Sequence, residues 1–425
     1  MTPSFSAGLV PLPQSSISQT TSLLYDPPSS SLALLHSDTS ISLYPSFSPT
    51  SLSSSSLSFP QTFISSPTSS ATFLPLLNPT HRRLLFLVIS PSHSPPSLLL
   101  RFWILKPCNN RFVRAHVECN YRLLNYDNVK SGVVFSVSHG ASVKVVAMSN
   151  VFVLYCVSSM MVYVFAMRVS GGEESESVKL MKTGVVECCL PVFSVGVSSR
   201  FLVLGEFEGV RVFPMQGLVK GRVKKSSAGR LVNLNDGKVN GGDKNSVSTK
   251  LRSARLRQDS KEGCAGFVSF KEDGDSFNSN ELQKKTVKAI NIEALSPNEF
   301  LVMDSAGRIH HLRLSNSVLG SEVSCCIDQL SLSIKVHKIA VLPGISSRAQ
   351  TLWISDGQHT VHTISLSDPD SSINGGDKKD DDRKLMQISV ASAIFSSETI
   401  QQLVPTAANA ILILGQGSIF AYTIS

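Results

Sequence analysis

The stretch EALSPNEFLVMDSAGRIHHLRLS (Glu293–Ser315) contains two short apolar runs separated by a polar turn. The runs are Phe300–Met303 and Ile309–Leu314, and Asp304 and Gly307 lie in the turn between them. Asp and Gly tolerate the left-handed backbone conformations that reverse a chain at little steric cost. In the second run apolar and polar residues largely alternate, which indicates a partly buried strand. The stretch therefore predicts a β-hairpin, and a lone hairpin needs neighbouring strands to cover it.

The same pattern of apolar run, turn and apolar run recurs along the chain. Close copies are Leu352–Leu366, Ile411–Ile424 and Phe201–Phe213, and looser copies are Leu32–Tyr44, Leu84–Leu105 and Val151–Arg168. The repeats start about 50 to 67 residues apart, except for one gap of about 100 residues after Phe201, and four-stranded propeller blades have about this period. We therefore predict an all-β protein with a single β-propeller of seven four-stranded blades. Six blades are the second choice, because Leu84–Leu105 and Val151–Arg168 match the pattern least well.

In this pattern the chain resembles the WD40-like β-propeller superfamily. The segment Leu23–Tyr44 (LLYDPPSSSLALLHSDTSISLY) runs strand, turn, strand, turn, strand. Asp38, Asp304 and Asp356 fall in or beside the turns at which WD repeats commonly carry Asp. The chain has no Trp-Asp dipeptide and no Gly-His that opens a repeat, so the resemblance is one of pattern. It implies a propeller fold and no particular activity.

The last repeat supplies only three strands, so its fourth, outer strand has to come from elsewhere in the chain. The spare apolar segment is Phe5–Leu12, which we predict to pair antiparallel with Ile419–Ile424 and to close the ring. Prolines at its ends are tolerable because an outer strand has a free edge. We also expect the apolar face of each second strand to lie between neighbouring blades. The residues expected there are Leu34, Leu202, Leu204, Leu301, Met303, Ile354, Leu412 and Leu414.

The formal net charge of +8 is concentrated in one stretch. Between Met215 and Lys288 there are 16 Lys or Arg against 8 Asp or Glu, and the rest of the chain balances at 23 against 23. We interpret this as a neutral propeller, in residues 1–216 and 286–425, that carries a flexible basic insertion at 217–285 after the fourth blade. One outer strand is predicted inside the insertion, near 264–270. The insertion is expected to be dispensable for folding, because a longer flexible loop costs little closure entropy.

Within the insertion, KLRSARLR (Lys250–Arg257) contains the candidate partner-binding or nuclear-import residues Lys250, Arg252, Arg255 and Arg257. A basic cluster in a flexible segment can be an import signal, a nucleic-acid tether or a contact for an acidic partner. It can equally be a solvated loop whose charges only keep it soluble. No aromatic residue interleaves with these charges, which disfavours nucleic-acid binding by base stacking.

No residue pattern in the chain indicates a catalytic, metal-binding or cofactor-binding site. Phosphate-binding loops of the P-loop and dinucleotide types are absent from the sequence. Ser, His and Asp cluster at Ser355–His359 and His36–Asp38, where turns recruit these residues for local hydrogen bonds. His310 and His311 are adjacent, so on a strand they face opposite ways and cannot share a metal ion. We interpret these histidines as solvated or locally hydrogen-bonded.

The cysteines, the first 80 residues and one uncharged stretch indicate where in the cell the protein is located. Eight cysteines show no framework spacing, and no glycosylation sequon is present, which indicates a reducing compartment, the nucleus or the cytoplasm. The Ser-rich, acid-poor first 80 residues leave organelle targeting as an alternative. Val145–Met167 carries no charge and is long enough to cross a bilayer. Its Ser and Asn residues stand where turns belong, so a buried hairpin is favoured over a membrane span.

These observations predict a non-catalytic WD40-like scaffold or adaptor, a monomeric propeller that works within a complex. It would bind protein partners through its loops and the basic insertion, without a cofactor. One alternative is an organelle-targeted or membrane-associated protein. The other is an enzyme with a site in the central channel, which would need polar side chains from several blades to converge there.

Overall fold

The structure is a computed structural model that describes most of the chain. The described residues are 5–10, 19–47, 60–65, 67–78, 82–93, 96–119, 124–137, 142–170, 177–220, 254–259, 266–270, 286–316, 323–332, 334–342, 349–367 and 387–424. Of the candidate residues, Arg255 and Arg257 are among them, whereas Lys250 and Arg252 lie outside them.

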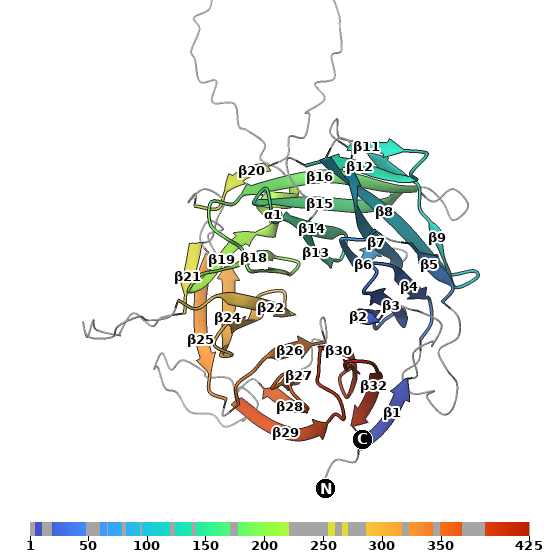
Figure 1. The fold of residues 1–425 in the computed structure, drawn as a ribbon. Helices are drawn as coiled ribbons and strands as arrows, with labels where there is room; N and C mark the ends of the chain where they lie inside the picture. The colour runs from blue at the N-terminus through green and yellow to red at the C-terminus, as the bar shows by residue number, and fades with distance from the viewer. Residues whose placement is uncertain are drawn as a thin grey trace, which may run out of the picture.

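In the described part of the chain, the strands form seven mainly antiparallel sheets arranged around a ring (Figure 1). This is the seven-bladed β-propeller that the repeats predict. Blade 1 contains β2 (Thr20–Asp26), β3 (Ser31–His36), β4 (Ile41–Tyr44) and β5 (Thr62–Ile64). Blade 2 contains β6 (Ser70–Leu77), β7 (Arg82–His93), β8 (Pro96–Lys106), β9 (Arg111–Arg114), β11 (Leu124–Asp127) and β12 (Gly132–Ser136). Blade 3 contains β13 (Val143–Met148), β14 (Val151–Cys156), β15 (Met161–Ser170), β16 (Ser177–Glu187), β10 (Val117–Cys119) and β20 (Ala254–Arg257).

Blades 4 to 7 each contain four of the described strands. Blade 4 contains β17 (Ser194–Val197), β18 (Phe201–Glu206), β19 (Gly209–Pro214) and β21 (Gly266–Ser269), with helix α1 (Met215–Lys220) after β19. Blade 5 contains β22 (Ala289–Ser296), β23 (Glu299–Asp304), β24 (Ile309–Asn316) and β25 (Val323–Leu330). Blade 6 contains β26 (Lys338–Val341), β27 (Ala349–Ser355), β28 (Thr360–Ser367) and β29 (Gln387–Phe395). Blade 7 contains β30 (Gln402–Ala407), β31 (Ala410–Leu414), β32 (Ile419–Ile424) and β1 (Phe5–Val10).

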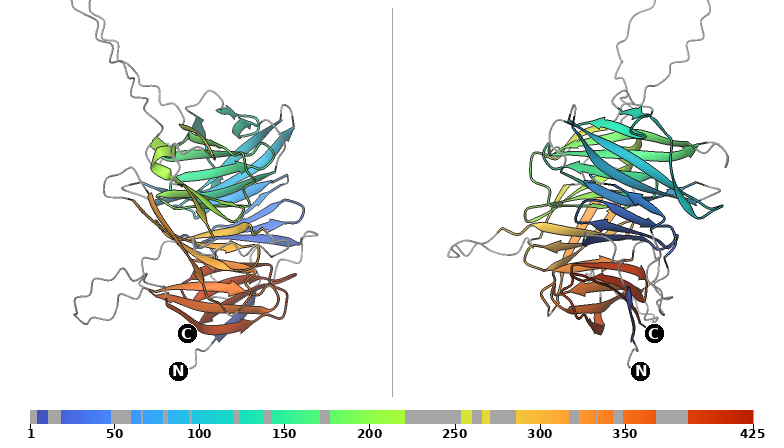
Figure 2. Two further views of the ribbon diagram at one scale, coloured as in Figure 1. Left: turned by 90° about the vertical axis from the view of Figure 1, so that its left-hand side faces the viewer. Right: turned by 45° about the vertical axis from the view of Figure 1, so that its right-hand side comes forward.

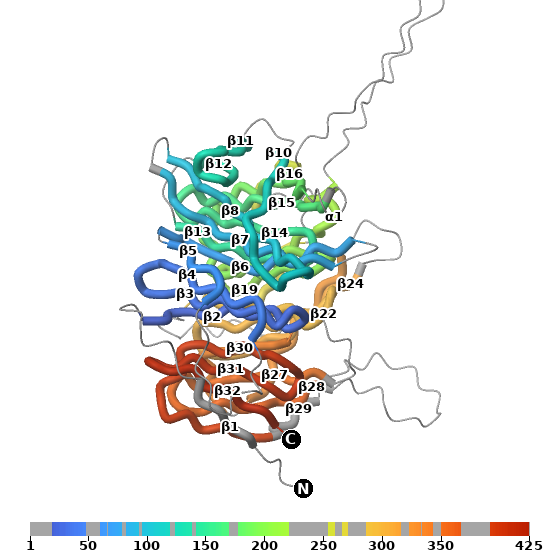
Figure 3. Tube along the Cα trace, turned by 90° about the vertical axis from the view of Figure 1, so that its right-hand side faces the viewer, coloured from blue at the N-terminus to red at the C-terminus, as the bar shows by residue number. Residues whose placement is uncertain are grey.

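The two ends of the chain meet in blade 7. Strand β1 pairs antiparallel with β32, from Phe5 opposite Ile424 to Val10 opposite Ile419. This is the predicted pairing, although Pro11 and Leu12 lie outside the described residues. In the side views blade 1 lies between blades 2 and 7, and β30 lies close to β2 (Figures 2 and 3). The ring is therefore closed by a blade that combines both ends of the sequence.

The hydrophobic core is divided among the interfaces between blades. All eight residues expected there have at most 3% of their surface exposed. Leu301 and Met303 of blade 5 pack with Ile354 of blade 6, and Leu34 of blade 1 packs in one cluster with Leu412 of blade 7. The prediction for the second strands is confirmed. Each blade buries its two apolar faces against its neighbours, so no single blade has a core of its own.

The uncharged stretch Val145–Met167 forms most of the hairpins of β13, β14 and β15, as predicted. Its side chains pack against blades 2 and 4 on either side. None of the described helices is long and apolar enough to cross a membrane.

The stretch interpreted as an insertion contains more regular structure than the sequence predicts. The expected outer strand near 264–270 is β21, which pairs with β19 and completes blade 4. Two further elements were not predicted, α1, which extends into the stretch as far as Lys220, and β20. Strand β20 alternates buried Ala254 and Leu256 with exposed Arg255 and Arg257. That period of two is present in the sequence, but four charges in eight residues obscured it.

Candidate interaction surface

The predicted site residues that the structure describes lie on β20, at the outer edge of blade 3 (Figure 1). Strand β20 pairs in parallel with β16, from Gly184 opposite Ala254 to Glu187 opposite Arg257. The structure therefore places Arg255 and Arg257 together on the solvent face of one strand, two residues apart. The sequence marks these residues as a basic cluster and does not predict the strand that carries them.

Both guanidinium groups are exposed, and with the described residues they make only surface ion pairs. Arg255 Nη2 lies 3.8 Å from Glu187 Oε1, and 76% of the Arg255 side-chain surface is exposed. Arg257 Nη2 lies 3.2 Å from Asp259 Oδ2. Exposed ion pairs of this kind contribute about 0 to 1 kcal/mol to stability. Replacing Glu187 or Asp259 by a carboxylate of a partner therefore costs little. Both arginines can therefore turn to an external anion.

A buried glutamine fixes the end of β20. Gln258 has no exposed surface, and its backbone N–H donates to the carbonyl of Glu187 at 2.8 Å. Its Nε2 donates to Glu206 Oε1 and its Oε1 accepts from the N–H of Leu190, both at 2.8 Å. Glu206 in turn accepts from Arg211 Nε at 2.6 Å. This network ties a strand on blade 3 to strands β18 and β19 of blade 4.

Sequence reasoning missed Gln258. Nothing in the spacing of Glu206, Arg211 and Gln258 marks them as partners, because the contact joins residues about 50 positions apart across two blades. A buried amide that satisfies both its donor and its acceptor specifies one position of the strand, since any shift would leave a polar group unpaired.

Strand β20 covers only part of the edge of β16, at its C-terminal end. Nearer the N-terminal end, Val178–Leu180 pair in parallel with β10, which follows β9 of blade 2 in the chain. Among the described strands β20 pairs with β16 alone, so its outer backbone edge faces no other strand. An open edge can accept an extended segment of a partner through main-chain hydrogen bonds.

Lys182 of β16 adds a further positive charge near Arg255 on blade 3. The ammonium of Lys182 lies 4.8 Å from the ring centre of Tyr163 and 5.4 Å from that of Phe135. Burial lowers the pKa of Lys182, and the positive charge of Arg255 lowers it further. The two side chains therefore share one region of positive potential.

The polar residues that a catalytic hypothesis would use serve the turns instead. Asp304 Oδ1 accepts from the N–H groups of Ala306 and Arg308, at 2.9 and 3.0 Å. Its Oδ2 lies 2.7 Å from Arg308 Nε and 3.2 Å from His310 Nε2. The imidazole of His310 is buried and stacks on Phe270, with ring centres 4.1 Å apart. His310 is therefore locally hydrogen-bonded and not solvated, which is one of the two alternatives that the sequence left open.

The two Ser, His and Asp clusters behave in the same way. In the first, His36 Nε2 lies 2.9 Å from Ser42 Oγ, and Asp38 Oδ1 accepts from the N–H of Ser40 at 2.9 Å. In the second, Asp356 Oδ1 accepts from the N–H of Gln358 at 2.9 Å, and His359 Nδ1 lies 3.2 Å from the carbonyl of Ser396. These contacts stabilise hairpin turns. Within the described ranges, no group of three or more His, Cys, Asp or Glu side chains is placed to hold a metal ion.

The adjacent cysteines do not bridge. Cys188 is buried beside exposed Cys189, and half-buried Cys325 precedes exposed Cys326 on β25. Every cysteine in the described part of the chain is free. Burial raises the pKa of Cys188 to about 12, which keeps that thiol protonated near neutral pH.

Comparison with known proteins gives structural similarity only. No protein-family model matches the chain, and no curated protein matches it in sequence. One similar solved structure is the β-propeller domain of Cps50 (Swd1) from Myceliophteria thermophila, with 8% identity, a TM-score of 0.49, and coverage of 99% of this chain and 100% of that one. Another is the β-propeller domain of Nup133 from Vanderwaltozyma polyspora, with 11% identity, a TM-score of 0.45, and coverage of 99% and 98%.

Proposed function

We propose that this protein is a non-catalytic propeller scaffold that binds protein partners, and that β20 with its neighbouring basic residues is a contact for an acidic partner. The observation that carries the proposal is the exposure of Arg255 and Arg257 on a strand whose end is fixed by buried Gln258. A pre-positioned charged strand loses less conformational entropy on binding than a mobile loop does. The open backbone edge of β20 adds a second means of contact.

The non-catalytic part of the proposal is supported by the use of the polar side chains. Asp304, His310, His36 and Asp356 each have a partner within their own hairpin, and these contacts hold turns together. A nucleophile or a general base has to reach a substrate atom, and these groups are already engaged. We further propose that the protein works as a monomeric propeller within a complex, in the nucleus or the cytoplasm, where its free thiols stay reduced.

The test replaces Lys250, Arg252, Arg255 and Arg257 by Ala together. The matched control replaces Arg168, Arg200, Lys335 and Lys338, which are exposed basic residues outside β20 and outside the basic stretch, so that both variants lose four positive charges. Tagged proteins are purified from cells at low salt and at about 0.5 M salt, where screening extends to only a few ångströms. We expect the first variant to lose an acidic partner that the control retains, and the wild type to lose the same partner at high salt. An unchanged, salt-insensitive set of partners would overturn the proposal.

The boundaries of the basic stretch need revision before it is deleted. Residues 217–285 include buried Leu218, Leu256 and Gln258, together with the outer strand of blade 4. Burying one leucine side chain contributes about 1.5 to 3 kcal/mol, so removal of the whole stretch should destabilise the ring. Replacing only residues 221–253 by a short Gly-Ser linker leaves α1, β20 and β21 in place. We expect that variant to keep its melting temperature, and the larger deletion to lower it by several degrees.

A further inference from the structure

Blade 2 presents a buried tryptophan whose ring lies close to two arginines. Trp103 on β8 has 5% of its surface exposed and packs in the core cluster between blades 1 and 2. The guanidinium carbon of Arg114 lies 4.1 Å from the indole centre, and that of Arg101 lies 5.7 Å from it. Burial lowers the pKa of Arg101, and the charge of Arg114 lowers it further. Two like charges are therefore held on one aromatic side chain.

These charges meet where the outer edge of blade 2 is interrupted. Residues Trp103–Lys106 of β8 pair with β9, whereas Ser97–Leu100 pair with β12. Arg114 is the last residue of β9, and Lys130 lies in the turn that leads into β12. Arg101 lies on β8 between the two pairings, and Arg114 reaches the carbonyl of Ser131, the residue after Lys130, so the three cations lie along one edge of the blade. We name Arg101, Arg114 and Lys130 the basic rim.

A glycine permits this close approach. A Cβ atom on Gly132, the first residue of β12, would lie 2.9 Å from the carbonyl oxygen of Leu100 and 3.0 Å from Cγ of Arg101. Real Cβ atoms very seldom approach neighbours so closely, so β12 can begin beside Arg101 only with glycine there.

Among the described residues, the members of the basic rim donate only to neutral oxygens. Arg101 Nη2 donates to Ser90 Oγ at 2.7 Å, Arg114 Nη1 donates to the carbonyl of Ser131 at 3.3 Å, and Lys130 Nζ donates to Ser92 Oγ at 3.3 Å. The Nε of Arg101 is buried and has no hydrogen-bond partner among the described residues. In that part of the chain no carboxylate forms an ion pair with any of the three.

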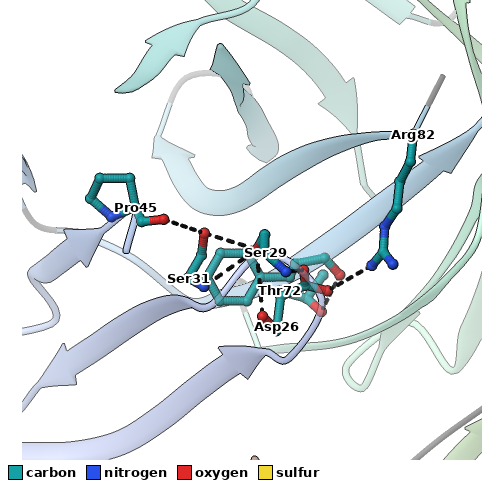
Figure 4. A network of polar contacts seen from close by, with 7 residues as sticks. Asp26, Ser29, Ser31, Pro45, Thr72 and Arg82 are labelled. Carbon is teal, nitrogen blue, oxygen red and sulfur yellow. Dashed lines mark hydrogen bonds and ion pairs between the residues drawn. The ribbon is translucent and has the colours of Figure 1, made fainter. Parts of the chain in front are cut away.

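Two nearby carboxylates have other partners. Asp127 Oδ1 accepts from the N–H groups of Val129 and Lys130, at 2.9 and 3.0 Å, and so stabilises the turn. Asp26 of blade 1 pairs with Arg82 at 3.3 Å and also accepts from the N–H of Ser29 (Figure 4). Arg82 is therefore neutralised across the interface between blades, whereas the basic rim is not.

The surrounding sequence strengthens the positive potential. Residues 82–137 contain eight Lys or Arg (Arg82, Arg83, Arg101, Lys106, Arg111, Arg114, Arg122 and Lys130) against two acids (Glu118 and Asp127), a surplus of six. Since the chain outside the basic stretch balances overall, the remaining blades carry the opposite charge. The propeller is thus neutral in the net charge of all its blades together, but blade 2 by itself is positively charged.

We propose that the basic rim binds a short acidic segment of a partner protein, through carboxylates that bridge Arg114, Lys130 and Arg101. Guanidinium groups whose planes are fixed against an aromatic ring are suited to forked hydrogen bonds with carboxylates. A protein segment fits better than a nucleic acid, because Trp103 is covered and offers no face for a base to stack on. This site lies on a different blade from β20 and does not rest on the function proposed for β20.

The experiment measures binding of a short fluorescein-labelled peptide of alternating Glu and Asp by fluorescence anisotropy, with a Gln/Asn peptide as the neutral control. Arg114→Gln with Lys130→Gln should weaken binding about tenfold or more, because both side chains are exposed and lose charge-assisted hydrogen bonds. Arg114→Lys with Lys130→Arg keeps both charges and should retain most of the affinity. Arg255→Gln with Arg257→Gln removes two charges from β20 and should leave most of the binding in place. Thermal melts check that each variant is folded.

Three outcomes would overturn the proposal. The first is equal affinity of the wild type and the Arg114/Lys130 glutamine variant for the acidic peptide. The second is loss of peptide binding only in the Arg255/Arg257 variant, which would assign the acidic contact to β20. The third is tighter binding of a single-stranded oligonucleotide that the Arg114/Lys130 variant abolishes, which would make the rim a nucleic-acid surface.

Discussion

Replacement of Asp304 by Asn should destabilise the propeller in a pH-dependent way. Asp304 is fully buried, and burial alone would raise its pKa. Hydrogen bonds from His310 and Arg308, with the charge of Arg308, outweigh burial and lower the pKa from 3.8 to about 2. A lowered pKa in the folded state means that the ionised carboxylate stabilises the fold by about 1.4 kcal/mol for each pKa unit, or about 2 kcal/mol here. Asn keeps the Oδ1 acceptor but places an amide N–H₂ opposite Arg308 Nε.

The sign of the pH dependence follows from that shift. The stabilisation is complete above the unfolded-state pKa, near pH 4, and is lost as the pH falls through the folded-state pKa of about 2. Urea unfolding followed by circular dichroism should therefore show a difference of about 2 kcal/mol between wild type and Asp304→Asn near pH 7, and about half of that near pH 3.

Asp356→Asn is the matched control. Asp356 occupies the equivalent turn of blade 6, and its Oδ1 accepts from the N–H groups of Gln358 and Thr360 at 2.9 and 3.3 Å. No cation pairs with its carboxylate among the described residues, so Asn should serve almost as well, with a loss of about 0.5 kcal/mol or less. Equal losses in the two variants, or a loss in Asp304→Asn that does not shrink towards low pH, would refute the reasoning.

Three further changes test the packing and the closure of the ring. Leu412→Asp places a charge in the interface between blades 7 and 1 and should cost several kcal/mol, seen as a large drop in melting temperature. Gly205→Ala puts a Cβ atom 2.5 Å from the carbonyl oxygen of Ala289 on blade 5, and should cost about 1 to 3 kcal/mol in the same assay. Removal of residues 1–10 leaves Ile419–Ile424 without its outer partner, and should lower the melting temperature and promote self-association measured by light scattering.

The sequence was sufficient for features that depend on local pattern. The hairpin at Asp304 follows from its turn residues, and Gly307 has the positive φ of +82° that such a turn requires. Burial of Leu412 and Leu301 could be predicted because each lies in an apolar run next to a polar turn, which marks a buried strand. Even the pairing of Phe5–Val10 with β32 could be predicted, because a blade of three strands needs a fourth and one apolar segment was spare.

Features that depend on where two distant segments meet could not be predicted. Strands β10 and β20 have three and four residues, and each pairs in parallel with β16 from another part of the chain. Short parallel pairings leave no turn and no register pattern in the sequence. The role of Gln258 could not be predicted for the same reason, since its hydrogen-bond partners are distant in the sequence.

The positive charge of blade 2 was not predicted because the charges outside the basic stretch were summed together. A balance of 23 against 23 outside the basic stretch gives a neutral average, yet a Debye length of about 10 Å at 0.1 M salt means that only neighbouring charges interact. Arg101 and Arg114 are 13 positions apart in sequence and share one indole ring in the fold. A count taken blade by blade would have identified blade 2.

Both basic surfaces occur where a blade departs from the four-stranded plan. In blade 2 the outer edge changes from β9 to β12, and in blade 3 it is extended by β10 and β20. A regular outer strand pairs along its whole length, so its side chains have neighbours to neutralise or cover them. An interrupted or added strand brings charges together without such neighbours, and departures of this kind are where binding sites are expected. The two surfaces are also connected, because the chain runs from β9 directly into β10 on the edge of β16. A partner with two acidic segments could engage both, and its second contact would then form at the high effective concentration set by the first.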